Sequence, residues 1–75
     1  MTVMSNIPLK SSDIQEVYED YEIYRMAFGR MCSEYSGIMI DLYSRSKNSE
    51  EVVLSAYENR VFLKILYLLN RRNLK

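Results

Sequence analysis

Apolar and aromatic residues recur at alternating steps of three and four through the first half of the chain. The run consists of Ile14, Val17, Tyr21, Tyr24, Phe28, Met31, Tyr35, Ile38 and Leu42. This spacing places all of them on one face of an α-helix, as at the a and d positions of a coiled coil. Ser12 and Gln15 form a capping-box pattern at its start, so we predict one long helix over residues 12–44. Residues 1–11 are predicted to be an extended lead-in, because Pro8 disfavours helix.

The second half of the chain predicts another helix after a short turn. Residues 45–48 are polar and rich in turn formers. Asn48 and Glu51 repeat the capping-box pattern, and no glycine or proline follows, so we predict a second helix over residues 49–73. Two helices with a short connection form an antiparallel hairpin, so the expected fold is all-α, in a single domain of 75 residues. The hairpin would place the acidic start of the first helix beside the basic end of the second.

Small residues interrupt the first predicted helix. Gly29, Ser33 and Gly37 recur every four residues on the side away from the apolar stripe. Such spacing allows close approach of another helix. Glycine also weakens a helix by about 1 kcal/mol relative to alanine, so the pattern favours a bend. A break near Gly29 or Gly37 would give three helices in place of two.

The second predicted helix is apolar on all sides between Val61 and Leu69, where Lys64 is the exception. A helix of this kind is normally buried all round, whereas a hairpin covers one side only. We therefore expect the hairpin to assemble into an intermolecular helical bundle, with a second copy of itself, such as a homodimer, or with another protein. A first helix that bends back to form a three-helix core would remove this need.

Several side chains are predicted to contact the partner. Tyr18 and Tyr43 lie beside the strict stripe, and tyrosine is enriched at interfaces because it combines a large apolar ring with a hydroxyl. The full predicted partner-binding set is Tyr18, Tyr43, Phe62, Leu66, Leu69, Arg71 and Arg72.

Composition argues against several classes of function. The chain has no histidine and one cysteine, Cys32, which we expect to be a core residue, so we predict no metal and no cofactor. It has no glycine-rich phosphate loop and no nucleophile motif, so we predict neither an enzyme nor a small-molecule substrate. The formal net charge is zero, and direct binding to nucleic acid is not expected. No apolar run approaches the roughly 18 residues that span a bilayer, and no secretion signal precedes the helices, so we expect a cytoplasmic protein.

These features predict a non-enzymatic protein–protein interaction module, such as a small adaptor, an inhibitor or a chaperone-like regulatory subunit of bacterial or phage type. The segment Ser55–Val61 (Ser-Ala-Tyr-Glu-Asn-Arg-Val) and the lead-in Met4–Leu9 also resemble the Hha family of small helical proteins that bind nucleoid-structuring proteins. The resemblance implies an alternative, a transcription or nucleoid modulator that acts through a DNA-binding partner. The chain departs from that family in its acidic first helix and in Asn59, where a histidine is expected.

Overall fold

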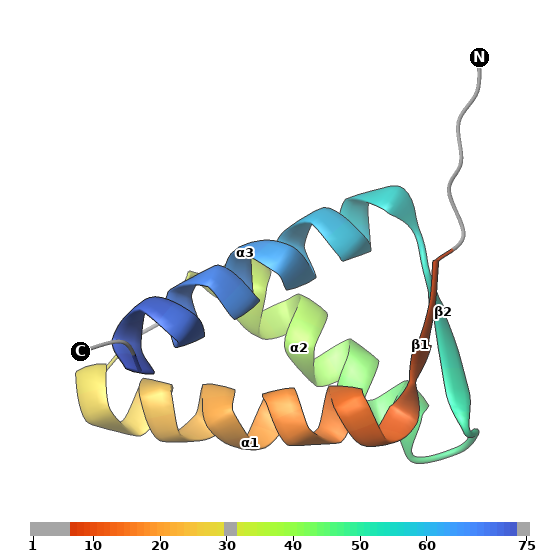
Figure 1. Ribbon diagram of the computed structural model, residues 1–75, viewed down its shortest axis with the longest axis horizontal. Helices are drawn as coiled ribbons and strands as arrows, with labels where there is room; N and C mark the ends of the chain where they lie inside the picture. The colour runs from red at the N-terminus through yellow and green to blue at the C-terminus, as the bar shows by residue number, and fades with distance from the viewer. Residues whose placement is uncertain (1–6, 30–31, 74–75) are drawn as a thin grey trace.

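The structure, a computed structural model, describes residues 7–29 and 32–73, and side chains as far as Asn70. Helices dominate it, which confirms the all-α class, and a small sheet joins two of their ends (Figure 1). The elements in chain order are β1 (Ile7–Lys10), α1 (Ser11–Phe28), α2 (Ser33–Ser46), β2 (Glu51–Leu54) and α3 (Ala56–Asn73).

The first helix ends at Phe28, with Gly29 as its C-cap, so the single helix predicted over residues 12–44 is two helices. Gly29 has a φ of 95°, a conformation that glycine adopts readily and other residues rarely do. Its N–H donates to the Arg25 carbonyl at 2.8 Å. Gly37 lies inside α2 and does not end it. The three-helix alternative is therefore the observed one, with Gly29 as its break.

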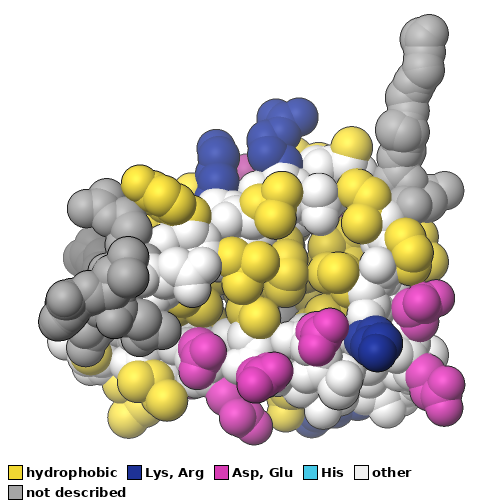
Figure 2. Space-filling model, viewed as in Figure 1, with side chains coloured by type: hydrophobic (Ala, Val, Ile, Leu, Met, Phe, Trp, Pro, Cys, Tyr) yellow, Lys and Arg dark blue, Asp and Glu magenta, His cyan; other side chains and the backbone are white. Residues whose placement is uncertain are grey.

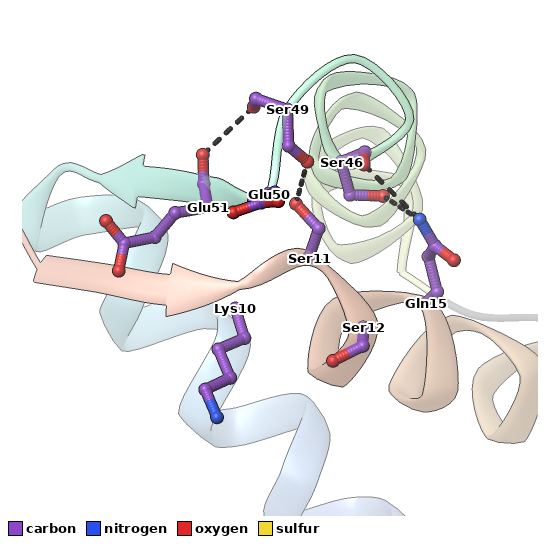
Figure 3. A pocket seen from close by; sticks show the side chains of 8 residues that line it. All are labelled: Lys10, Ser11, Ser12, Gln15, Ser46, Ser49, Glu50 and Glu51. Carbon is purple, nitrogen blue, oxygen red and sulfur yellow. Dashed lines mark hydrogen bonds between the residues drawn. The ribbon is translucent and has the colours of Figure 1, made fainter.

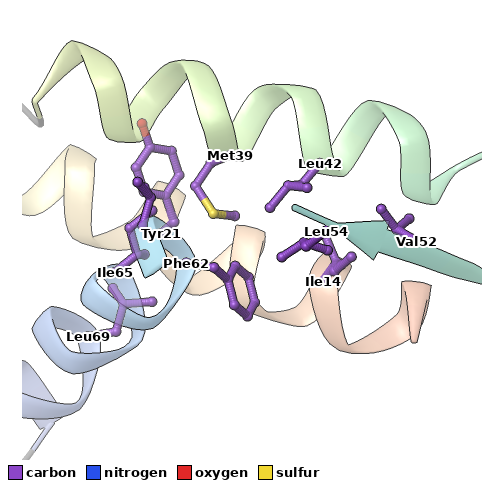
Figure 4. Packing of buried hydrophobic residues seen from close by; sticks show 10 residues of the cluster. Ile14, Tyr21, Met39, Leu42, Val52, Leu54, Phe62, Ile65 and Leu69 are labelled. Atoms are coloured by element: carbon purple, nitrogen blue, oxygen red, sulfur yellow. The ribbon is translucent and has the colours of Figure 1, made fainter. Parts of the chain in front are cut away.

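The break folds the apolar stripe onto itself. Ile14 and Tyr21 on α1 and Leu42 on α2 are buried in one core (Figure 4). Four further members, Val17, Tyr24, Tyr35 and Ile38, are partly buried against that core. Phe28, next to the break, is exposed, and Met31 lies outside the described residues. The spacing of three and four therefore directs apolar side chains of two shorter helices into one shared core.

Residues predicted to begin the second helix form strand β2 instead. Its side chains alternate between exposed and buried, with Val52 and Leu54 in the core. It pairs antiparallel with β1, and the Ser11 N–H continues the ladder to the Glu50 carbonyl at 2.9 Å. Because ladder bonds alternate, Pro8, which has no N–H, lies at a position that points away from β2.

The helix starts differ from both predicted capping boxes. α1 follows Lys10 without a side-chain cap, and no helix begins after Asn48. The box that forms is at the start of α3: the Ser55 hydroxyl accepts from the Glu58 N–H at 3.1 Å, and a Glu58 carboxylate oxygen accepts from the Ser55 N–H at 3.0 Å. These reciprocal bonds satisfy two backbone donors that a helix start leaves open.

The apolar run of α3 is covered largely within the chain. Val61, Phe62, Ile65 and Leu69 are buried in the core that α3 shares with α1 and α2 (Figure 4). α2 supplies the cover that a two-helix hairpin lacks. Burial of this run therefore does not by itself require a second chain.

The topology also separates the charges that the hairpin would have paired. α1 and α3 both start at the sheet and run toward the opposite end of the molecule (Figure 1). The acidic first half of α1 therefore lies at the sheet end, whereas the last turn of α3 lies near the end of α1. Among the described side chains, the ion pairs join Arg25 to Glu22, and Arg45 to both Asp41 and Glu58. None of them links α1 to α3.

Candidate protein-binding surfaces

Tyr18 and Tyr43, two of the predicted partner-binding residues, stack on each other. Their ring centroids are 4.1 Å apart and their planes differ by 11°. The Lys47 ammonium lies 4.7 Å from the centroid of the Tyr43 ring. Burial raises the pKa of the Tyr18 hydroxyl, and a hydrogen bond with Glu22 raises it further. The stack therefore holds α1 to α2, and both rings remain only half-buried.

The predicted residues of the second helix lie in different places. Phe62 is 4% exposed and Leu69 is 6% exposed, so both belong to the core of this chain and do not face another one. This corrects the prediction, and the reason is that α2 covers the side of α3 that a hairpin leaves open. Leu66 is half-buried at the margin of the core. Arg71 and Arg72 lie in the last turn of α3, and their side chains fall outside the described ones.

Other large apolar side chains are exposed to solvent. Their exposed fractions range from 46% at Tyr57 to 80% at Met26. The set comprises Ile23, Met26, Phe28, Ile40, Val53, Tyr57, Leu63 and Tyr67. Leu63 and Tyr67 belong to the apolar run already singled out in the sequence, but only the position of α2 decides which members of that run point outward.

The flank of α1 that faces away from α2 carries Val17 and Tyr24. Each follows a buried residue, Ile14 or Tyr21, by three positions, whereas Tyr18 follows Ile14 by four and contacts α2 on the opposite flank. Val17 and Tyr24 are half-buried and pack against the core. They therefore form a partly open apolar edge along α1.

Leu63 and Leu66 form the matching edge of α3. Each follows a buried residue, Phe62 or Ile65, by one position. Leu63 and Leu66 lie three positions apart, so they share one flank of α3. Leu66 packs against the core, whereas Leu63 is 55% exposed.

We call the surface formed by Val17, Tyr24, Leu63 and Leu66 the α1–α3 face. Figure 2 looks onto it and shows hydrophobic side chains gathered between the two helices. Acidic side chains line α1 on one side of this apolar strip, with one basic side chain in the same row toward the sheet end, and basic side chains stand along the outer edge of α3 on the other. An apolar centre with a charged rim is the usual layout of a protein interface.

Charged residues lie about one helical turn from the α1–α3 face. Asp13 and Asp20 precede Val17 and Tyr24 by four positions, and Arg60 precedes Leu63 by three and Lys64 by four. Asp13 and Asp20 on α1 are exposed, and so are Arg60 and Lys64 on α3. None of these four forms an ion pair with another described side chain. The molecule therefore has an acidic edge and a basic edge although its formal net charge is zero.

An open, polar hollow of about 620 Å³ lies where α1 meets the loop after α2 (Figure 3). The Ser11 hydroxyl donates to the Ser49 carbonyl at 2.5 Å, and the Gln15 amide donates to the Ser46 carbonyl at 3.3 Å. These bonds join the start of α1 to the loop, so we assign the hollow a structural role. Its lining residues are Lys10, Ser11, Ser12, Gln15, Ser46, Ser49, Glu50 and Glu51.

Cys32 and the acidic residues form no metal-ligand group in the described ranges. Cys32 is predicted to be a core residue inside one long helix. It is instead exposed at the start of α2, because the predicted helix is interrupted after Phe28. Within residues 7–29 and 32–73, no three His, Cys, Asp or Glu side chains are grouped as metal ligands. No helix in these ranges has the length and apolar character to cross a membrane.

The segment that resembles the Hha family has a local structural role here. Ser55 and Glu58 are the capping pair of α3, and Val61 lies in the core. A helix start followed by a core residue accounts for these shared residues. The chain matches no family model, no curated protein and no solved structure.

Proposed function

We propose that this chain is a non-enzymatic interaction module that binds another polypeptide through the α1–α3 face. The observation that carries the proposal is Leu63, a residue of the α1–α3 face that is 55% exposed. The apolar strip in Figure 2 has charges of opposite sign along its two sides. In the cell it would act as a small adaptor, inhibitor or chaperone-like regulatory subunit, and we place it in the cytoplasm.

The energetics of apolar burial support binding at this face. Full burial of a leucine-sized side chain contributes about 1.5–3 kcal/mol. Leu63 retains more than half of its accessible surface, and the half-buried Val17, Tyr24 and Leu66 retain part of theirs. A partner that covers the strip would gain from all four side chains while its own charged groups meet the rim.

The polar groups of the chain support binding over catalysis. The Ser11 hydroxyl and the Gln15 amide in the hollow of Figure 3 already bond to backbone carbonyls, and the sequence contains no histidine to act as a general base near neutral pH. These features support the exposed apolar strip as the functional surface.

Co-purification from the source cell tests the proposal. Tagged wild-type chain is compared with Leu63→Asp and with Ile40→Asp, a control because Ile40 is 56% exposed but lies on α2, behind the α1–α3 face. We expect wild type and Ile40→Asp to retain the same bound protein and Leu63→Asp to lose it. Equal recovery of the same proteins by all three chains would contradict the proposal.

A further inference from the structure

We infer that the occupant of the α1–α3 face is a second copy of this chain, in a two-fold dimer whose axis runs parallel to the apolar strip. The inference rests on the proposed function and identifies the partner. It depends on the order of the charges across the face: an acidic edge on α1, an apolar strip, and a basic edge on α3.

This order makes the face complementary to itself in one orientation. A two-fold axis that lies in the interface and runs along the strip places the α1 edge of each copy over the α3 edge of the other. Asp20 then faces Lys64 of the second copy, and symmetry produces the same pair again on the other side. Asp13 approaches Arg60 in the same way, since both lie nearer the sheet end of their helices.

The perpendicular orientation is disfavoured by the same charges. An axis in the interface but across the strip would lay α1 on α1 and α3 on α3. Asp13 and Asp20 would then meet the acids of the other copy, and like charges that meet across an interface are strongly unfavourable. The charge pattern therefore selects one of the two simple isologous arrangements.

The dimensions of the molecule suit such a contact. The side of the molecule seen in Figure 2, which includes the α1–α3 face, spans its two longer dimensions, 38 and 29 Å. A standard interface buries about 800 Å² on each partner, which fits within a side of this size if residues around the α1–α3 face also take part. The formal net charge of zero means that no net repulsion opposes the approach of two copies.

Light scattering on the purified chain tests the dimer over a hundredfold range of concentration at low salt. We expect twice the 8.9 kDa chain mass at high concentration, with dissociation on dilution and on addition of salt. Leu63→Asp should remain at 8.9 kDa, whereas the equally exposed control Ile40→Asp should dimerise like wild type. Unchanged helical circular dichroism shows that both variants fold. A wild-type mass of 8.9 kDa at every concentration would overturn the inference.

A charge swap tests the direction of the axis. Asp20→Lys and Lys64→Asp alone should each raise the dimer dissociation constant about tenfold, because two symmetric contacts change from attraction to repulsion. The double variant should return to within about twofold of wild type, since each reversed charge again meets its opposite. A double variant no tighter than the single ones would overturn this axis.

The two proposals fail in distinguishable ways. A monomeric wild type whose cellular partner is still lost with Leu63→Asp overturns the second copy as occupant and supports the α1–α3 face as an interaction surface. If no protein, including a differently tagged copy, depends on Leu63 in the cell, both proposals are overturned.

Discussion

Tyr21 brings a hydroxyl group into the centre of the fold. Its side chain is 1% exposed, and its hydroxyl lies 2.5 Å from the Ser36 hydroxyl on α2. A buried polar group without a partner costs about 1–3 kcal/mol, so this bond removes a penalty that burial of tyrosine would otherwise impose. It also fixes α2 against α1 across the break at Gly29.

Removal of the Ser36 hydroxyl should destabilise the fold. We expect Ser36→Ala to lower the free energy of unfolding by about 1–2 kcal/mol, because the Tyr21 hydroxyl is then buried without its partner. Ser36→Ala combined with Tyr21→Phe should cost less than the sum of the single changes. Urea denaturation measures all three, with Ser44→Ala on the exposed side of α2 as a control. Equal stability of Ser36→Ala and Ser44→Ala would contradict this account.

Protonation of the Glu58 carboxylate should change the free energy of unfolding. Partial burial raises the pKa of its carboxyl, but the Ser55 N–H and the Arg45 guanidinium lower it by more, so the pKa lies below its ordinary value of 4.5. Because the folded pKa is below the unfolded one, the contribution of Glu58 is fully present above about pH 4.5. It is lost as the pH falls through the folded pKa.

Glu58→Gln tests that dependence. At neutral pH we expect the variant to be less stable than wild type by about 1 kcal/mol, because it loses the charged half of the capping box. The difference should shrink as the pH falls below about 4.5, where the wild-type carboxylate also becomes protonated. Denaturation at a series of pH values measures it, with the exposed Glu34→Gln as a control. A difference that does not change with pH would count against the role of the charge.

At the scale of the element, a break in the first predicted helix was foreseeable but its position was not. Gly29 and Gly37 have the same intrinsic weakness in a helix, so local preference does not distinguish them. Packing distinguishes the two glycines. When the helix ends at Gly29, the chain forms two helices, Ser11–Phe28 and Ser33–Ser46, and both are long enough to place several residues of the apolar stripe in or against the core. That is a property of the folded chain and cannot be read from either glycine alone.

The two glycines should respond to alanine in opposite ways. Neither added methyl group would meet another atom within 4 Å, so backbone preference alone decides the effect. Gly29→Ala should destabilise by about 1–2 kcal/mol because of its positive φ. Gly37→Ala should stabilise by about 0.5–1 kcal/mol inside α2. Thermal unfolding compares them directly, and a Gly29→Ala variant at least as stable as Gly37→Ala would show that the break lies elsewhere.

Strand β2 forms through a long-range pairing that local sequence patterns do not reveal. Its two valines favour a strand, but a pair of β-branched residues before an apolar run also fits a helix. Its partner is β1, at the other end of the sequence, so no local pattern reveals the pairing. The sequence contains two capping-box patterns before the last helix, one at Ser55 and Glu58 and one at Asn48 and Glu51. The second cannot begin a helix, because Glu51 lies in strand β2 and Asn48 in the loop before it.

At the scale of the whole molecule, the extra helix changes the direction of α3 relative to α1. A hairpin would have run them antiparallel and paired acids with bases inside the chain. The return through α2 runs them in the same direction, and leaves an acidic and a basic edge on either side of an apolar strip (Figures 1 and 2). The prediction of an apolar binding surface stays a prediction, but its residues move from Phe62 and Leu69 to Leu63 and its neighbours.

Site-specific photo-crosslinking in the living cell tests most directly that the α1–α3 face is a protein-binding surface. A photoreactive amino acid replaces Leu63 in one variant and Ile40 in another, two positions of nearly equal exposure. We expect a discrete adduct of one size from position 63, formed with a second copy or another protein, and none from position 40. Adducts from position 40 alone, or no discrete adduct from either position, would contradict it.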